Sequence, residues 1–268
     1  MTTPKSLNYL ITGSARGIGR GLSRLLLHRG HRVFLLDSNA DELSHTTRTL
    51  QKQFPKDISS TRCNLRNPAE ITASVNRASD FFSGHLDVLI NNAANTGGIP
   101  GAPLADLTLE EWNASVETNL TAPMLMVQAC LPMLKKTASR PNAGCVINVS
   151  STRAVQSEEN SEAYASTKAG LVGLTHSLAV SLTPAGVRVN VMLLGWINVA
   201  NECKEADEKG TRWEEGLTEE DHRWHLTGRV GKVDDVWRYV EYLSEAEFVS
   251  GSEHVIDGGV TRRMVYPE

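Results

Sequence analysis

The spacing of apolar residues changes regularly along the chain, and this alternation predicts the fold. Short runs of aliphatic and β-branched residues have the length and composition of buried strands. They cover residues 7–12, 31–36, 58–63, 86–90, 145–150, 187–193 and 254–256. Between most of them, apolar residues recur every three or four positions, as on amphipathic helices. Strands and helices that alternate in this way predict an α/β fold with a doubly wound parallel sheet of about seven strands.

Helices are predicted in the intervals between the strands. One runs from the end of the glycine-rich loop to residue 28, and the others cover residues 40–53, 68–82, 108–136, 163–182 and 233–243. Residues 199–226 show no clear period and carry many charges, which fits a flexible segment over a substrate. No internal repeat or linker-like stretch interrupts the pattern. We therefore expect a single domain over residues 1–268, with a substrate lid around 195–226 and a C-terminal tail at 260–268.

Composition and charge argue against several classes of partner. Of the 268 residues, 40% are hydrophobic and 22% are charged, which is enough for one large core. A net charge of −4 without any basic run does not favour nucleic acid as a partner. No apolar run is long enough to span a bilayer, and no signal peptide fits before the first strand. The strand-like surroundings of Cys63 and Cys145 predict buried thiols in a reducing compartment, so we expect a cytoplasmic protein.

A glycine-rich loop directly follows the first predicted strand. Gly13, Gly17 and Gly19 have the spacing G-x-x-x-G-x-G, and a predicted helix begins there. In such a loop the backbone can approach a pyrophosphate, whose charge is favoured at the N-terminus of the helix. Three glycines alone are weak evidence, but their place between strand and helix predicts a dinucleotide cradle.

Asp37 ends the second predicted strand, twenty residues after Gly17 (37 − 17 = 20). An acidic residue at about this distance binds the adenosine ribose. Its carboxylate accepts hydrogen bonds from the ribose hydroxyls and repels a 2′-phosphate, which favours NAD(H). Arg16 supports the opposite choice, since a cation beside the ribose favours NADP(H). Asp37 could also be the N-cap of the next helix, and both roles can coexist.

Tyr164 and Lys168 lie four residues apart on a predicted helix and therefore point to the same side. Ser151 precedes Tyr164 by thirteen residues (164 − 151 = 13) and ends a buried strand, where open α/β sheets bind ligands. A phenol has a pKa of about 10, and a nearby ammonium lowers it. Tyr164 could then act as a general acid/base while Ser151 holds the reacting oxygen. Alone, the pair could equally be an ordinary surface contact.

Asn119 falls in the middle of the long predicted helix over residues 108–136. Asparagine is slightly unfavourable inside a helix. Asn119 is therefore either a solvated polar residue or the site of a kink that orders a water molecule.

Together these motifs resemble the short-chain dehydrogenase/reductase family over about residues 7–259. The resemblance rests on TGSARGIG at 12–19, Asp37, NNAA at 91–94, Asn119, NVSS at 148–151, the Tyr164/Lys168 pair and DGG at 257–259. It implies a three-layer Rossmann-like fold and hydride transfer between a nicotinamide and a carbonyl or alcohol carbon, without a metal. It also implies that Tyr164 is the acid/base and that Lys168 binds the nicotinamide ribose and depresses the tyrosine pKa.

The resemblance assigns further roles along the chain. Ser151, rather than Ser150, would orient the substrate oxygen, and Asn119 would hold a water that links Lys168 to solvent. The residues implied to contact the cofactor are Gly13, Arg16, Gly17, Ile18, Gly19, Asp37, Asn64, Leu65, Asn92, Ala93, Tyr164, Lys168, Ile197 and Val199.

Three positions depart from the family pattern. Leu194 stands where the family usually has proline, Val199 where it favours threonine, and Asn64 where aspartate is common. These changes leave open a non-redox catalyst on the same scaffold, such as a cyclase, isomerase or dehydratase. A binding module without chemistry is a third alternative, but it would not need the full set of polar residues.

Other features of the sequence have two interpretations each. His222 and His225 have the spacing of a metal chelate, although aromatic and basic residues in a lid more often cover a substrate. Trp196, Trp213 and Trp224 could form an aromatic wall for a small apolar substrate, or simply pack in the core. In relatives, the two long helices and the tail make subunit contacts, so we expect a homodimer or homotetramer.

Overall fold

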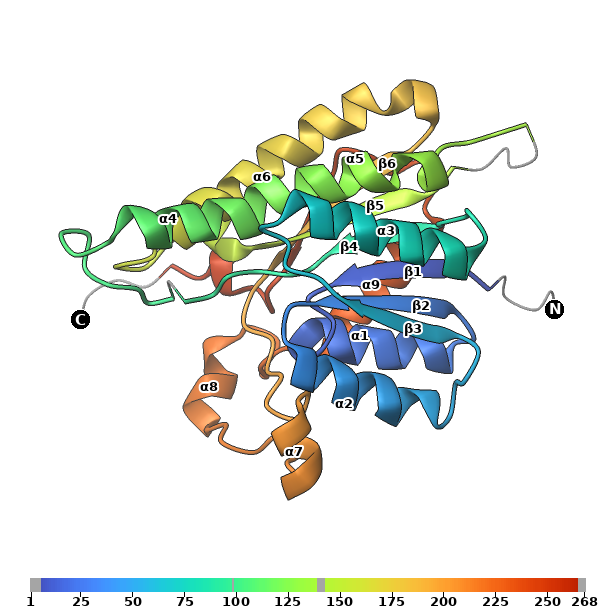
Figure 1. Cartoon of the computed structure of the whole chain (residues 1–268). Coiled ribbons are helices and arrows are strands. Elements are labelled where there is room, and N and C mark those ends of the chain that lie inside the picture. The colour runs from blue at the N-terminus through green and yellow to red at the C-terminus, as the bar shows by residue number, and fades with distance from the viewer. Residues whose placement is uncertain (1–5, 98, 139–142, 265–268) are drawn as a thin grey trace.

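The structure is a computed structural model that describes residues 6–97, 99–138 and 143–264. Within this part of the chain, seven parallel strands form one sheet in the order β3-β2-β1-β4-β5-β6-β7 (Figure 1). The strands are β1 Asn8–Thr12, β2 Arg32–Asp37, β3 Ile58–Arg62, β4 Val88–Asn91, β5 Cys145–Ser151, β6 Arg188–Leu194 and β7 Glu253–Ile256. The predicted α/β doubly wound sheet is therefore confirmed.

Helices cover both faces of this sheet (Figure 1). One face carries α1 Gly17–His28, α2 Ala40–Gln51 and α9 Val233–Glu245. The other carries α3 Pro68–Phe82, α4 Leu109–Val116, α5 Ala122–Leu134 and α6 Glu162–Ser181. Successive strand residues point to opposite faces, so Tyr9 joins the core under α1 and α9 while Leu10 joins the core under α3 and α5. Both faces are thus buried, which explains the continuous apolar runs of the strands.

The order of the strands determines where a ligand can bind. The chain builds outward from β1 through β2 to β3 and then returns to place β4 on the other side of β1. Open α/β sheets bind ligands at such a switch point, beyond the carboxyl ends of the strands. At this edge β1 ends at Thr12 and β4 at Asn91, while Ser151 of β5 is in register with Leu194 of β6.

The single helix predicted over residues 108–136 is wrong in detail. A π-helical turn at Glu117–Thr121 separates α4 from α5. Pro123 has no N–H, so it cannot donate the α-helical bond to the carbonyl of Asn119, four residues earlier. The side chain of Asn119 is also held by the loop after β4, since its Oδ1 accepts a hydrogen bond from the Asn95 N–H at 2.6 Å. Asn119 therefore marks a real interruption of the helix.

The 195–226 segment contains two short helices that its sequence pattern did not predict. They are α7 Lys204–Lys209 and α8 Glu219–Trp224. Six residues are too few for a helical period to be visible, but each helix has a cap: Ala206 N–H donates to Cys203 Sγ, and Thr218 caps α8. Arg263, just before the end of the described chain, donates to the carbonyls of Arg223 and Trp224. The rest of the predicted tail, residues 265–268, lies outside the described residues.

Two further expectations concern the compartment and the membrane. Cys63 and Cys145 are buried free thiols, as predicted, and Cys130 is buried as well. Of the helices in the described ranges, none combines the length and the apolar character needed to cross a membrane.

Candidate functional site

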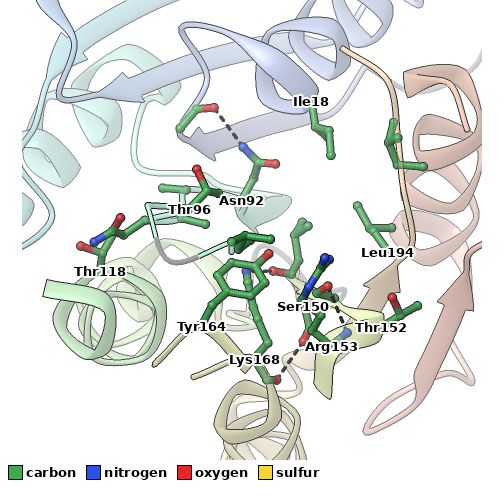
Figure 2. A pocket seen from close by; sticks show the side chains of 18 of the residues that line it. Ile18, Asn92, Thr96, Thr118, Ser150, Thr152, Arg153, Tyr164, Lys168 and Leu194 are labelled. Carbon is green, nitrogen blue, oxygen red and sulfur yellow. Dashed lines mark hydrogen bonds between the residues drawn. The ribbon is translucent and has the colours of Figure 1, made fainter. Parts of the chain in front are cut away.

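A cleft of about 1320 Å³ opens at the carboxyl edge of the sheet. Gly13, Asp37, Trp196 and Trp224 are among the residues that line it, and Figure 2 shows Tyr164 and Lys168 beside it. The sequence-predicted residues that line it are Gly13, Arg16, Ile18, Asp37, Asn64, Leu65, Asn92, Ala93, Ser151, Tyr164, Lys168, Ile197 and Val199. Gly17, Gly19 and Asn119 are not among the lining residues. The structure therefore brings nearly all predicted site residues to one cavity.

The glycine loop is held close to the end of β4. Gly13 has φ +62°, and a Cβ atom there would lie 2.6 Å from the Cα of Ala93. A Cβ atom on Gly19 would lie 2.2 Å from the Gly13 carbonyl oxygen. Asn92 donates from Nδ2 to the carbonyls of Thr12 (3.0 Å) and Gly13 (2.9 Å). Gly19 and Asn92 thus shape the loop from behind.

The N-terminus of α1 fits an anionic ligand. Its N-cap residue, Arg16, makes no side-chain hydrogen bond to the helix, and the first turn contains no acidic residue. The first N–H groups of a helix have no acceptor inside it, and the helix dipole favours negative charge there. Because Ile18 in this turn lines the cleft, the diphosphate of a dinucleotide would fit at this point.

Asp37 is oriented by two backbone groups. Its Oδ2 accepts a hydrogen bond from the Ala15 N–H (3.0 Å), and its Oδ1 accepts one from the Asn39 N–H (2.9 Å). Asn39, not Asp37, is the N-cap of α2, because Asn39 Oδ1 accepts from the Glu42 N–H. The alternative that Asp37 caps the helix is therefore wrong. A carboxylate has about four acceptor sites, so it retains the capacity to bind ribose hydroxyls in the cleft.

Tyr164 and Lys168 are buried, which excludes an ordinary surface pair. Tyr164 is 8% exposed and Lys168 only 2%. Lys168 Nζ donates to the carbonyl of Val149 (2.7 Å) and lies 5.4 Å from the centroid of the Tyr164 ring. Ser151 lies close enough to Tyr164 to lower its pKa, and its Oγ accepts a hydrogen bond from the Arg153 N–H (3.2 Å). The neighbouring Ser150 instead donates to the Lys168 carbonyl and ties β5 to α6.

The electrostatics of Tyr164 differ from the sequence-based expectation. Burial raises the pKa of Tyr164, against a lowering by the hydrogen bond with Ser151 and by the charge of Arg153. Burial also lowers the pKa of Lys168 to about 8. The expectation that Lys168 brings the tyrosine pKa below its ordinary value is therefore wrong. Desolvation dominates here, and the ammonium points at the carbonyl of Val149.

Asn119 lies behind the cleft, with its side chain fully engaged. Besides accepting from Asn95, it donates from Nδ2 to the Asn95 carbonyl (3.2 Å) and to Thr167 Oγ1 (3.1 Å). Thr167 precedes Lys168 on α6. The amide thus connects the loop after β4 to the helix that carries the tyrosine and the lysine.

The tryptophans and histidines of the 195–226 segment have separate locations. Trp196 and Trp224 line the cleft, whereas Trp213 lies under Lys232, whose Nζ is 4.0 Å from its ring centroid. The Nδ1 atoms of His222 and His225 contact the Val230 N–H and the Asp221 carbonyl. Across the described ranges, no group of three or more His, Cys, Asp or Glu side chains is arranged to hold a metal ion.

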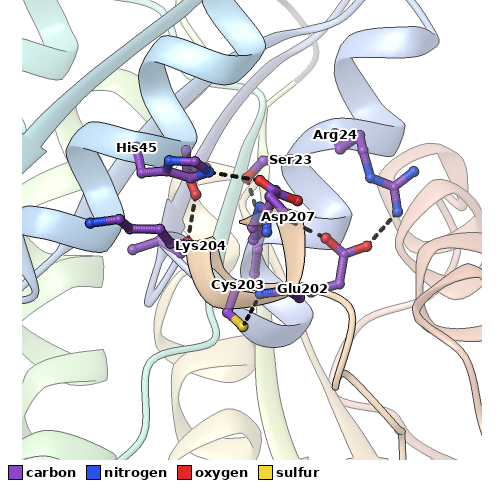
Figure 3. A network of polar contacts seen from close by, with 12 residues as sticks. Ser23, Arg24, His45, Glu202, Cys203, Lys204 and Asp207 are labelled. Atoms are coloured by element: carbon purple, nitrogen blue, oxygen red, sulfur yellow. Dashed lines mark hydrogen bonds and ion pairs between the residues drawn. The ribbon is translucent and has the colours of Figure 1, made fainter. Parts of the chain in front are cut away.

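A polar network that the sequence did not indicate connects α7 to α1 and α2 (Figure 3). Glu202 is 3% exposed and pairs with Arg24 (2.5 Å) and, more loosely, with Arg20 (3.9 Å). Arg20 also pairs with Asp207 (2.6 Å), which accepts a further contact from His45 (2.7 Å). The main-chain carbonyl of Glu202 accepts from Gly17 N–H at 2.7 Å. The network thus joins the 195–226 segment to the glycine loop.

Glu202→Gln is expected to lower the free energy of unfolding by about 3 kcal/mol. The substitution removes a buried negative charge from two arginines, and Arg20, whose side chain is 7% exposed, keeps only Asp207. Denaturant unfolding at neutral pH measures the loss. Lys209→Gln is the control on the same segment, because its pair with Glu205 is largely exposed and should contribute little to stability. Equal effects of the two substitutions would contradict a buried role for Glu202.

Comparison with known proteins shows the family to which this chain belongs. The family model described as enoyl-(acyl carrier protein) reductase matches residues 13–261. An uncharacterized oxidoreductase of Thermotoga maritima is 32% identical over 263 residues, covering 97% of this chain and 97% of that protein. The structure of an apo SCOR enzyme from Clostridium thermocellum superposes with a TM-score of 0.80 at 31% identity, covering 96% of this chain and 94% of that one.

A second similar structure was solved with a bound cofactor. A short-chain dehydrogenase from Burkholderia cenocepacia in complex with NADP matches with a TM-score of 0.78 and 25% identity, covering 96% of this chain and 98% of that one. The matches extend over nearly the whole chain, from the glycine loop past the last strand. The chain is therefore an NAD(P)-dependent oxidoreductase and belongs to the short-chain dehydrogenase/reductase family.

Proposed function

We propose that this enzyme interconverts a carbonyl and a secondary alcohol, or an imine and an amine, with Tyr164 as the general acid/base. The observation that carries the proposal is the group formed by Tyr164, Ser151 and Lys168 at one cavity. Ser151 lies close enough to Tyr164 to lower its pKa, and the lysine lies buried against the tyrosine ring. Two neighbouring hydroxyls that line one cavity can bind one substrate oxygen and exchange one proton with it.

Each residue has a defined part in this mechanism. In reduction, Tyr164 Oη donates its proton to the substrate oxygen while the Ser151 hydroxyl keeps that oxygen in place. When bound, the nicotinamide supplies or accepts the hydride at the carbon that bears this oxygen. The ammonium of Lys168 favours the phenolate as it forms and would bind the hydroxyls of the adjacent ribose. In oxidation the proton returns to Tyr164.

We propose that Asn119 holds the water that would link Lys168 to solvent. Its side-chain amide already bonds to Asn95 and Thr167, so the amide is not the group that holds this water. The main-chain carbonyl of Asn119 is the better acceptor, because Pro123 cannot donate the usual helical bond to it. The π-helical turn thus removes the α-helical donor from this carbonyl, in a turn packed against α6.

Absorbance of the nicotinamide tests the proposed reaction. A panel of small, mainly apolar ketones, secondary alcohols and imines should include compounds whose conversion changes this absorbance in proportion to product. Conversion of a substrate without any absorbance change, at the same rate without nicotinamide, would instead establish a non-redox cyclase, isomerase or dehydratase. Tight cofactor binding with no turnover across the panel would favour a binding module.

We propose a preference for NAD(H) over NADP(H), and Asp37 as its cause. The carboxylate is held toward the ribose end of the cleft, where it repels a 2′-phosphate, while the exposed Arg16 attracts one. Asp37→Asn should raise the ratio of kcat/KM for NADPH to that for NADH by about tenfold or more. Arg16→Gln should lower the same ratio. A ratio that Asp37→Asn leaves unchanged would contradict the assignment.

We also propose that the enzyme is a homodimer or homotetramer. Apolar side chains are exposed on the outer helices, with Val180 on α6 at 76% and Met124 on α5 at 38%. Burying them against a second copy would remove apolar area from water. Light scattering after size-exclusion chromatography measures the mass, and a monomer at working concentrations would overturn this proposal.

A further inference from the structure

Arg153 and Glu158 form a charged pair in the cleft that the mechanism above does not use. Arg153 lies two residues beyond Ser151, in the short helical turn Thr152–Ala154, and Figure 2 shows its side chain in the cavity with Tyr164. Glu158 follows in the segment that leads to α6 and lines the same cavity. Neither residue was predicted from the sequence as part of the site.

The contact between these two side chains is incomplete. Arg153 directs both Nε (3.0 Å) and Nη2 to one oxygen of Glu158, Oε1. A guanidinium is best satisfied when two parallel bonds reach both oxygens of a carboxylate. The side chains are 30% and 46% exposed, and such partly exposed pairs typically contribute about 0–1 kcal/mol. A carboxylate from solution could therefore replace Glu158 at small cost.

The two partners are held unequally. The backbone of Arg153 is fixed, because its N–H donates to Ser151 Oγ in the turn at the end of β5. Its charge also lowers the pKa of Tyr164. The cation thus extends from an anchored turn beside the reaction centre, and the anion is the more exposed partner.

We propose that the substrate carries a carboxylate that binds Arg153 in place of Glu158. The proposal rests on the function above for the identity of the reacting atoms. It narrows the substrate to a small oxo or hydroxy carboxylic acid, whose carbon skeleton lies against Trp196 and Trp224 while its oxygen meets Tyr164 and Ser151. A single guanidinium matches the single charge of a carboxylate, and Glu158 keeps that charge neutral until the substrate arrives.

Binding of matched probes tests this assignment independently of turnover. Cyclohexanecarboxylate and cyclohexanecarboxamide have the same shape and differ in charge. With NADH or NADPH saturating, calorimetry should give an affinity about tenfold higher for the acid than for the amide. Arg153→Met should abolish this difference, while Glu158→Gln should increase the affinity for the acid severalfold by removing its competitor. Melting temperatures near that of the wild type would verify that both variants fold.

Three outcomes would overturn the proposal. The wild type could bind acid and amide equally, including no detectable binding of either; Arg153→Met could retain the preference; or cyclohexylamine could bind better than the acid and lose this advantage in Glu158→Gln. Tyr164→Phe separates the proposed carboxylate site from the proposed role of Tyr164 in proton transfer, because this variant should lose turnover and keep the preference for the acid. A preference for the acid without redox turnover would leave Arg153 assigned and refute the proposed reaction instead.

Discussion

Tyr164→Phe is expected to leave nicotinamide binding close to that of the wild type while turnover falls by about 10²- to 10⁴-fold. The substitution removes one oxygen atom and retains the buried ring beside Lys168. Without the phenol, the hydroxyl proposed to give its proton to the substrate oxygen is missing. Fluorescence titration of the cofactor, together with steady-state rates from nicotinamide absorbance, separates the two effects.

Tyr9→Phe provides the matched control for this change. Tyr9 is also buried, and its hydroxyl donates to Ser244 (3.1 Å) in the core under α9, away from the cleft. Its loss should cost about 1 kcal/mol of stability and leave turnover unchanged. Wild-type turnover in Tyr164→Phe would refute Tyr164 as the acid/base. A loss of cofactor binding would show that the hydroxyl acts in binding rather than in proton transfer.

The layers of the fold were predictable because their causes are local in sequence. Strands buried on both faces need continuous apolar runs, and helices on a sheet need one apolar face, so the strands and most helices on the sheet were predicted to within a few residues. The exceptions are α4 and α5, which were predicted as one helix, and the short α7 and α8, which were not predicted. The helix over 68–82 agrees at both ends, where Asn67 caps it, Pro68 opens it and Ser83 ends it in a left-handed conformation. A kink at Asn119 was one of two alternatives that the sequence left open, and the form of the interruption depends on Pro123 and on the distant Asn95.

The candidate site was predictable only where a residue's role follows from its place at the end of a strand or on a helix face. Gly13, Asp37, Ser151 and Tyr164 satisfy this condition, and all of them line the cleft. The pair formed by Arg153 and Glu158 does not, because it depends on how a loop without a period folds back on itself. The contact of Glu202 with the glycine loop joins residues far apart in sequence, and no local sequence pattern predicts it.

The pKa of Tyr164 illustrates the limit in physical terms. Spacing on a helix establishes that an ammonium is near a phenol, and this contact alone favours the phenolate. Burial disfavours the charged form of each group, so it raises the pKa of Tyr164 and lowers the pKa of Lys168. Its strength depends on what the rest of the chain places around them. Burial prevails and raises the tyrosine pKa, so the phenol is protonated at neutral pH, the form that can donate to a carbonyl.

Lys168→Met is expected to abolish measurable turnover and, near neutral pH, to stabilise the fold. Lys168 is 2% exposed, and burial lowers its pKa from 10.5 to about 8. Below pH 8 both the folded and the unfolded chain carry the proton, so the folded state bears the full unfavourable effect of burying an ammonium, roughly 3 kcal/mol. Methionine removes that charge at similar volume. The lost bond to the Val149 carbonyl offsets about 1 kcal/mol of the gain.

The pH dependence isolates the contribution of the charge. As the pH rises through 8, the folded state releases the proton before the unfolded state does, and the unfavourable effect is gone once both are neutral above 10.5. Between about pH 7 and pH 9.5, the free energy of unfolding of the wild type should therefore rise by about 2 kcal/mol relative to that of Lys168→Met. Urea unfolding at both pH values measures this difference. Lys56→Met, at an exposed position before β3, should leave the difference from wild type constant. Parallel stability curves for wild type and Lys168→Met would contradict an unfavourable buried charge at Lys168. Turnover retained in this variant would contradict a role of Lys168 in the reaction. An ammonium that acts in this cavity must be visible in both measurements.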